Sequence, residues 1–469
     1  MSLYKKKNIA LLGVCPIGKF VFSHEDAVRQ KKKIFKKLDE LNINYVTIEN
    51  ILPDGMVRDQ KHVDPVVEHF KKEKADALFI PHCNFGTEGA AGMIAKKLGV
   101  PTLLWGPRDE APLPDGSRLR DSLCGMFATS GVLRKLKVPF TYIENCTVED
   151  RQFIKGISLF VQVTAVVKAM KNMRIGKIGV RIDFFWSTIV NEAELLDKFG
   201  IQVLPVDLTD FINNVKKRSK KDRKKYKKEL IEIKKWLTVE GMDSNEPLLN
   251  SLALRDELLL LAEDQNLDAI TIKSFNSIQD ELGGGCGLGS AMVCDAGIPL
   301  IDETDLHGAI SSVLIEAASK VNEPGFFPEF VIRHPENNNA ALLWHATAPL
   351  SLKDPGSKVK IAPPWILKGL PPNSLHFKLK DGPLTLCRFE GACGEYILGA
   401  GECRTTTGPA TQEFYVWVEV DDWPNWERLL MEGPYIHHLS VVYDHCADVL
   451  EEACRYIPGL TSQRFDKKL

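Results

Sequence analysis

The stretch PLIDETDLHGAIS, residues 299–311, places three carboxylates within four positions. Asp302, Glu303 and Asp305 stand between an apolar run and the expected start of a helix near residue 306. Carboxylates this close repel one another, so some of them need a cation or a proton to be tolerated. A carboxylate at a helix amino terminus interacts favourably with the helix dipole, but such a cap explains one acid, not three. The cluster therefore indicates a binding site.

Three later motifs carry further groups that can bind a metal ion. GFFPEF places Glu329 among aromatic residues, where an unpaired carboxylate would be costly. ALLWHATAP puts His345 at the end of an apolar run, and PYIHHLSVVYD supplies His437 and His438. A single histidine is more often structural than a ligand. Taken together, two glutamates and these histidines form an oxygen and nitrogen donor set suited to Mn²⁺ or a similar divalent ion.

The segments around these residues predict the elements that position them. In residues 1–172, short apolar runs such as NIALLGV and DALFIPH alternate with helix-like stretches at 24–42 and 89–99. This alternation is typical of parallel strands with crossover helices, and it predicts a doubly wound α/β domain. Residues 82–92, HCNFGTEGAAG, follow one strand and begin a helix. This is a ligand-facing position in such a fold. A glycine-rich turn that binds no ligand is an almost equally good interpretation of the same residues.

A second copy of the pattern follows the helix-like stretch at 157–173. Strands are expected at 177–182, 202–208, 268–274 and 298–301, and helices at 192–200 and 248–266. Ligands bind at the carboxyl ends of strands in a parallel sheet. The three acids after residue 301 thus lie where a ligand is expected.

From about residue 350 the segments become short, alternating and separated by glycine or charge, which predicts antiparallel strands and a terminal helix at 446–457. The predicted fold class is α/β: two tandem doubly wound, Rossmann- or flavodoxin-like domains followed by an antiparallel β-barrel-like domain. The predicted domains are residues 1–172, 173–350, which carries the acidic motifs, and 351–469, which carries the two adjacent histidines.

Composition narrows the class of protein. The chain has 469 residues, 44% hydrophobic and 26% charged, which is ordinary for a soluble protein of several domains. A formal net charge of −2 gives no general attraction to nucleic acid or to an anionic membrane. No stretch reaches about 18 uninterrupted apolar residues. The 11 cysteines include no C-x-x-C pair, so a reducing cytoplasm is the expected location.

Two other patterns have ordinary interpretations. The lysine-rich segment 216–236 is expected to be a solvated helix face with Leu230, Ile231, Ile233 and Trp236 on its buried side, rather than a nucleic-acid site. The run GGGCGLG (283–289) matches no phosphate-binding motif and indicates a close backbone approach near a site.

The ordered motifs IDETDLHGAI, FFPEF, LLWHATAP and YIHHLSVVY resemble those of the L-fucose isomerase and L-arabinose isomerase superfamily. The spacing is similar as well, with 26 residues from Glu303 to Glu329 and 16 from Glu329 to His345. The likeness covers nearly the whole chain. It implies a metal-dependent aldose–ketose isomerase that acts on a monosaccharide through an enediolate.

The resemblance also implies the roles of individual residues. Glu303 and Glu329 match the two acids that bind the metal and move protons, and His345 matches a strand-end ligand of the arabinose branch. Either His437 or His438 completes the site. The implied ion is Mn²⁺, with Co²⁺ or Mg²⁺ as alternatives.

Members of this superfamily share active sites between subunits, which implies a homo-oligomer, a trimer or hexamer. Lys19, Asn84, Phe85 and Asp305 are the candidate sugar contacts, and the first three would act on a neighbouring subunit's site. Two other functions fit the same residues: a sugar-binding or regulatory protein without catalysis, and a metal-dependent epimerase or lyase.

Overall fold

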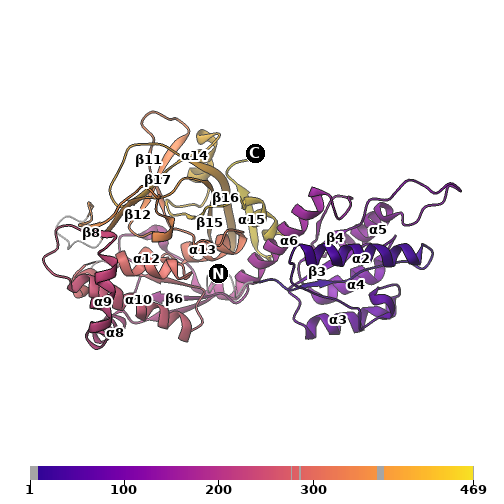
Figure 1. Cartoon of the computed structure of the whole chain (residues 1–469), viewed down its shortest axis with the longest axis horizontal. Helices are drawn as coiled ribbons and strands as arrows, with labels where there is room; N and C mark the ends of the chain where they lie inside the picture. Colours follow the sequence, from indigo (N-terminus) through magenta and orange to yellow (C-terminus); the bar gives the residue numbers. More distant parts are fainter. Residues whose placement is uncertain (1–8, 276, 285–286, 367–373, 468–469) are drawn as a thin grey trace. The chain divides into compact units, whose positions relative to one another are not determined.

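The computed structural model describes residues 9–275, 277–284, 287–366 and 374–467. The chain divides into two compact units, one formed by residues 9–168 and the other containing residues 169–469. Figure 1 labels many of the helices and strands of both.

The unit of residues 9–168 is built on a parallel sheet with the strand order β2-β1-β3-β4-β5. The strands are β1 (Leu12–Val14), β2 (Tyr45–Val46), β3 (Ala77–Pro81), β4 (Thr102–Trp105) and β5 (Thr141–Tyr142). β1, β3 and β4 are buried along their whole length, as expected for strands covered on both faces. The order reverses between β1 and β3, which makes the loops after these strands the ligand-facing position of a doubly wound fold.

Helices connect these strands: α2 (His24–Glu40), α3 (Val63–Lys72), α4 (Glu88–Leu98), α5 (Ser122–Lys135) and α6 (Arg151–Met170). The helices predicted at 24–42 and 89–99 are α2 and α4. The Ser23 side chain caps α2 by accepting a hydrogen bond from the amide of Asp26, and Gly99 ends α4 in the left-handed conformation. The sequence interpretation missed α5 and β5.

Helix α6 is long and apolar enough to cross a membrane by length and composition, with a mean hydropathy of 1.5. Within the protein, 44% of its apolar window is buried. Phe153, Ile157, Phe160 and Val163 are completely buried and recur at helical spacing. This is the pattern of a core helix with one buried face.

The second unit begins with a parallel sheet of order β10-β9-β6-β7. Its strands are β6 (Arg174–Ile178), β7 (Gln202–Val206), β9 (Ala269–Ile272) and β10 (Leu300–Ile301). The prediction of a strand at 177–182 was wrong by several residues, because Gly179 has a φ of +82° and the extended backbone ends there.

The helices of this region are α7 (Glu192–Phe199), α8 (Leu208–Lys221), α9 (Arg223–Ile233), α10 (Glu246–Asp264), α11 (Ser277–Leu282), α12 (Gly287–Asp295) and α13 (Leu306–Ala318). Every residue of α13 is buried. This helix contacts β9 of the parallel sheet as well as β15 (Pro383–Ala392) and β18 (Ser440–Val442) of the last sheet. A helix covered on all sides carries the acidic motif at its start.

The lysine-rich segment forms α9 and the end of α8 rather than a single helix. Its lysines are mostly exposed, as predicted for a solvated face. Leu230 and Ile233 are buried, but Ile231 and Trp236 are 63% and 52% exposed. The predicted buried stripe was therefore half wrong.

The glycine run has a packing role where the structure describes it. Gly285 and Cys286 lie outside the described residues. A Cβ atom on Gly289 would lie 2.1 Å from the carbonyl oxygen of Ser251, so α12 approaches α10 closely only with glycine at this position.

The last sheet has ten strands and is mixed but largely antiparallel. Besides β15 and β18, its strands are β8 (Leu237–Val239), β11 (Glu329–Arg333), β12 (Ala340–His345), β13 (Val359–Ala362), β14 (Ser374–Lys378), β16 (Glu395–Thr406), β17 (Phe414–Glu419) and β19 (Leu460–Arg464). Helices α14 (Trp423–Glu432) and α15 (Ala447–Cys454) also lie in this part of the chain, and the helix predicted at 446–457 is α15, which β19 follows. The predicted fold class is confirmed: two parallel α/β sheets precede a mixed sheet.

The boundaries of the three predicted domains stay a prediction. β8, β11 and β12 belong to the final sheet, although they precede residue 351 in the sequence. The predicted domains 173–350 and 351–469 fall within one compact unit.

Candidate active site

The acidic motif occupies a short turn between β10 and α13. Glu303 and Thr304 have φ angles of +62° and +52°, a left-handed conformation that is rare for residues other than glycine. Asp302, Glu303 and Asp305 are all buried, with 5%, 7% and 0% exposure. Burial, followed by the charge of Glu303, raises the pKa of Asp302 to about 6. The turn thus places several carboxylates in a region with little solvent.

Asp305 is fully engaged by its neighbours. Its Oδ1 atom accepts a hydrogen bond of 2.9 Å from the amide of Gly308, which caps α13. Arg388 Nη1 donates to Oδ2 at 2.5 Å and His438 Nδ1 donates to the same atom at 3.0 Å. Burial by itself would raise the pKa of Asp305, but Arg388 and His438 outweigh it and hold this pKa well below its usual value. Asp305 is therefore an ionised group held within the protein.

His438 links Asp305 to Glu303. Its Nε2 atom lies 3.3 Å from Glu303 Oε2, and its ring is completely buried. Burial disfavours a charged ring, but the two carboxylates outweigh burial and raise the pKa of His438 to about 9. Neither His438 Nε2 nor Glu303 Oε2 has a well-aligned hydrogen-bond partner among the described residues. Two buried polar atoms thus face each other without a good bond.

Glu329 and His437 lie beside this pair. Glu329 is the first residue of β11 and forms an antiparallel β-bridge with His438. The backbones of these two residues are therefore paired directly opposite each other. Its Oε2 atom lies 3.4 Å from His437 Nε2. Burial and the negative charge of Glu303 raise the pKa of Glu329 to about 7, although the positive charge of His438 lowers it. The His437 side chain is 39% exposed, and burial and His438 lower its pKa to about 4.

His345 ends β12 and lies next to His438, with 5.5 Å between the ring centroids. Its Nδ1 atom accepts a hydrogen bond from the amide of Ala346 at 2.8 Å and lies 3.7 Å from Asp302 Oδ2. Burial and the two neighbouring histidines hold the pKa of His345 well below its usual value. The ring is therefore neutral, which a metal ligand requires.

Three of these residues could hold a metal ion. One ligand atom from each of Glu303, His437 and His438 lies within 4.8 Å of the others. Glu329 and His345 are adjacent but outside this group. The structure thus brings together all five side chains that the sequence proposed as ligands, and three of them meet the geometry of a metal site.

Lys19, Asn84 and Phe85 belong to the other compact unit, in the loops after β1 and β3. The Lys19 amide donates to Asn84 Oδ1 at 2.7 Å, and Asn84 Nδ2 donates to the Lys19 carbonyl at 3.3 Å. Lys19 Nζ lies 4.5 Å from the Phe85 ring centroid and pairs with Glu88 at 3.2 Å. These contacts hold two loops together, and contact with a sugar stays a prediction.

Comparison with known proteins shows which proteins this chain is similar to. The family model for the N-terminal domain of fucose/sulfoquinovose isomerases matches residues 13–171. The chain is 23% identical to the sulfoquinovose isomerases of Priestia aryabhattai and Priestia megaterium over 464 residues, 96% of this chain and 98% of each relative. It is 24% identical to that of Alkalicoccus urumqiensis over 333 residues, 67% of this chain and 68% of the relative.

The chain is a distant homologue of the sulfoquinovose isomerases. The resemblance that the motifs predicted is confirmed at the level of a sugar isomerase family. The candidate site lies in the unit of residues 169–469, whereas the matched family domain covers the other unit.

Sequence reasoning missed the charged residues beneath the site. Arg388 and Glu390 are buried at alternate positions of β15, and His307 is buried in the first turn of α13. The sequence signal was present: two charged residues stand at i and i+2 within the apolar strand PLTLCRFEG. Residues at this spacing share one face of a strand, so this signal could have predicted a pair of charged side chains on an otherwise apolar surface.

Proposed function

We propose that this protein is a metal-dependent aldose–ketose isomerase, which moves a hydrogen between C1 and C2 of a monosaccharide through an enediolate. The observation that carries the proposal is the meeting of Glu303, Glu329 and His438, with 3.3 Å between His438 Nε2 and Glu303 Oε2. Homology to sulfoquinovose isomerases supports the same activity.

The residues present fit a divalent cation. Buried Glu303 Oε2 and His438 Nε2 lack a well-aligned partner among the described residues, and a cation between them would satisfy both. Oxygen and imidazole nitrogen donors together suit Mn²⁺, Co²⁺ or a similar ion. We propose His438 as the histidine ligand of the pair, since its Nδ1 atom is bonded to Asp305 and its Nε2 atom faces Glu303. A metal ion would displace the proton that Nε2 carries in the metal-free protein, where the pKa of His438 is about 9. Glu303 and Glu329 supply the carboxylates.

His437 and His345 stay proposed as further ligands. His437 meets the distance requirement but is partly exposed. His345 uses Nδ1 to accept a backbone hydrogen bond, which leaves Nε2 as its ligand atom.

Two carboxylates suit the chemistry of this reaction. The C2 proton of an aldose is too weak an acid to leave unaided at neutral pH. A cation bound here would act as a Lewis acid on the substrate oxygens and stabilise the charge of the enediolate. One of Glu303 and Glu329 takes the C2 proton and returns it to C1, and the other moves a proton between O1 and O2. The pKa of about 7 for Glu329 suits a group that both accepts and donates a proton.

Proton NMR in D₂O tests the proposal. Protein stripped of metal by a chelator is incubated with aldoses and ketoses, including sulfoquinovose, L-fucose and L-arabinose, with and without Mn²⁺. We expect ketose formation that requires Mn²⁺ and incorporates solvent deuterium. An aldose inverted at C2, or a ketose inverted at C3, would indicate an epimerase, and chain cleavage a lyase.

Two controls make the experiment decisive. Glu303→Gln should abolish the Mn²⁺-dependent product, while Glu432→Gln, at a side chain that is 68% exposed on α14, should leave it unchanged. If wild-type protein binds Mn²⁺ and sugar but converts none of the panel, the proposal of isomerisation for these sugars is wrong.

A further inference from the structure

A row of buried charges lies behind the candidate metal site. His307 Nδ1 donates to Glu390, Arg388 Nε and Nη2 donate to Glu390 Oε2 at 3.0 and 2.7 Å, and Arg388 also binds Asp305. Asp305 in turn accepts from His438 Nδ1. Four side chains therefore connect α13 and β15 to the proposed metal ligand, His438.

Arg388 is the central member of this row. Its side chain is completely buried, and its guanidinium contacts two carboxylates, each through two hydrogen bonds. Removing a cation and two anions from water is costly, and an apolar replacement of similar volume is often at least as stable. Stability alone is therefore a weak reason for this arrangement, and a role in the site explains it better.

Asp305 has little capacity left for a substrate. Its two oxygens accept from the Gly308 amide, from both terminal nitrogens of Arg388 and from His438 Nδ1. The residue is 0% exposed. These contacts argue against the sugar contact that its position in the sequence had predicted. They give Asp305 a different role, because the hydrogen bond to Nδ1 fixes both the tautomer and the orientation of the His438 ring.

We infer that Asp305 and Arg388 are positioning residues for metal binding. Asp305 holds Nδ1 of His438 so that Nε2 faces Glu303, and Arg388, itself fixed by Glu390, holds Asp305 in place. A carboxylate that accepts the second N–H of a ligating histidine orients the ring and makes it a better ligand. The inference rests on the proposed function, because it assumes that His438 binds the metal.

The test is the Mn²⁺ affinity of protein without substrate, measured from the EPR signal of free Mn²⁺. Asp305→Asn keeps the size of the side chain and its ability to cap α13 but removes the charge. We expect it to weaken Mn²⁺ binding about 10–100-fold. Asp207→Asn is the matched control, because Asp207 caps α8 by accepting from the amides of Thr209 and Asp210 at 2.8 and 3.0 Å. It should bind Mn²⁺ as the wild type does.

A double-mutant cycle separates positioning from general damage to the fold. If Asp305 acts through His438, then Asp305→Asn should weaken Mn²⁺ binding much less in a His438→Gln background than in the wild type. A role confined to folding would give the same loss in both backgrounds and would overturn the inference.

Arg388→Lys gives an independent test should Asp305→Asn fail to fold. A single ammonium cannot reproduce the four hydrogen bonds of the guanidinium, so Mn²⁺ affinity should fall several-fold while the positive charge is kept. Wild-type affinity in the folded Arg388→Lys or Asp305→Asn variant would overturn the inference but leave the proposed function intact. No Mn²⁺ binding by the wild type would overturn the proposed function and the inference with it.

Discussion

At the scale of single residues, the two carboxylates of the site should be indispensable for turnover. Glu303→Gln and Glu329→Gln each remove a group that can accept and return a proton, a contribution of about 10²–10⁴-fold. We expect each variant to lose most of its isomerase activity with an unchanged circular dichroism spectrum. Near wild-type turnover in either variant would remove that residue from the proposed mechanism.

A second carboxylate prediction concerns stability rather than catalysis. Glu413 is 2% exposed, and its Oε2 atom has no hydrogen-bond partner among the described residues. Burial raises its pKa from 4.5 to about 7. The folded protein therefore holds the Glu413 proton more tightly than the unfolded chain does. The stability that goes with the protonated side chain is fully present below pH 4.5 and is lost as the pH rises through about 7.

Glu413→Gln should remove this pH-dependent loss of stability, because glutamine does not ionise. Between pH 5 and pH 8, the free energy of unfolding of the variant should fall less than that of the wild type, by up to about 3 kcal/mol. Urea unfolding of metal-free protein at the two pH values measures the difference. The exposed control Glu432→Gln should follow the wild-type pH dependence, and an equal fall in Glu413→Gln would show that Glu413 keeps an ordinary pKa in the folded protein.

Residue type made part of this site predictable from the sequence. Acids and histidines next to apolar runs can be recognised in the sequence, and Glu303, Glu329 and His438 were proposed as site residues in this way. The structure brings these three residues together. Arg388 and His307 were missed because each has its partner on another element about 83 positions away, as the Arg388 contact with Asp305 and the His307 contact with Glu390 show. Pairing over such distances depends on the fold.

At the scale of elements, the turn between β10 and α13 holds Glu303 in an unfavourable conformation. Thr304, at a φ of +52°, is branched at Cβ and makes this turn especially strained. Thr304→Gly should relieve the strain and raise the free energy of unfolding by about 0.5–1 kcal/mol, less than the full strain because glycine also gains freedom in the unfolded chain. Turnover should fall, since Glu303 is then less well fixed.

The same substitution in ordinary backbone supplies the control. Thr209 lies in the first turn of α8 and has no such φ. Thr209→Gly should lower the stability measured by urea unfolding, because glycine is a poor helix former. If Thr304→Gly were destabilising as well, the strain assigned to the turn would be absent.

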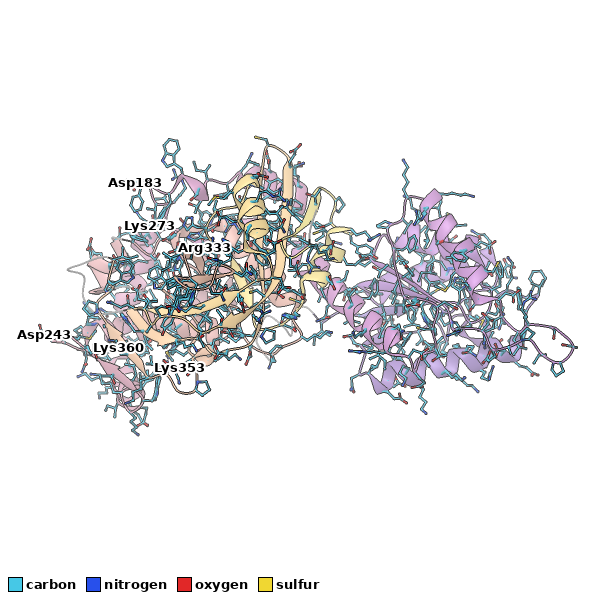
Figure 2. All side chains as sticks on the ribbon, turned by 90° about the horizontal axis from the view of Figure 1, so that it is seen from above. Asp183, Asp243, Lys273, Arg333, Lys353 and Lys360 are labelled. Atoms are coloured by element: carbon cyan, nitrogen blue, oxygen red, sulfur yellow. The ribbon has the colours of Figure 1, made fainter. Side chains whose placement is uncertain are left out.

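The carboxyl end of β9 offers a test of substrate class. The register between β9 and β10 aligns Leu300 with Ile270 and Ile301 with Thr271, so Lys273 follows β9 beside the position at which Glu303 follows β10. Lys273 (Figure 2) forms no ion pair with any residue that the structure describes. A free cation there would suit an anionic substituent such as the sulfonate of sulfoquinovose.

Lys273→Met should then raise KM for sulfoquinovose at least 10-fold, a loss of about 1.4 kcal/mol of binding, and leave KM for a neutral aldose unchanged. Lys220→Met, on the exposed surface of α8, should change neither value. An equal effect of Lys273→Met on charged and neutral sugars would assign the residue to general packing.

Elements were easier to predict than their ends. Long periodic segments such as α2 and α10 were found. The end of β6 depends on Gly179, which adopts a positive φ, and the sequence does not show which glycines do so. β8 was missed because three residues, LTV, have no pattern of their own. They form a strand only by pairing with β13, more than a hundred residues later.

At the scale of the whole molecule, all five proposed ligands lie in the unit of residues 169–469, and Lys19, Asn84 and Phe85 lie in the other. The family resemblance leads us to propose that these three residues reach the active site of a neighbouring subunit in a homo-oligomer. This arrangement predicts that two variants, each inactive alone, regain activity when they assemble into the same oligomer. Lys19→Met keeps an intact metal site, and Glu303→Gln keeps an intact N-terminal unit.

Co-assembly of these two variants tests the proposal. If sites are shared between subunits, random 1:1 assembly of a symmetric oligomer combines an intact metal site with an intact Lys19 at about a quarter of the sites, and activity should return to roughly that fraction. If each site is built from one chain, every site carries one of the two defects and no activity returns. Co-assembly of Glu303→Gln with Glu329→Gln is the matched control, because both substitutions lie in the same unit and cannot complement each other. Recovery with the first pair and none with the second would assign the two halves of the active site to different subunits.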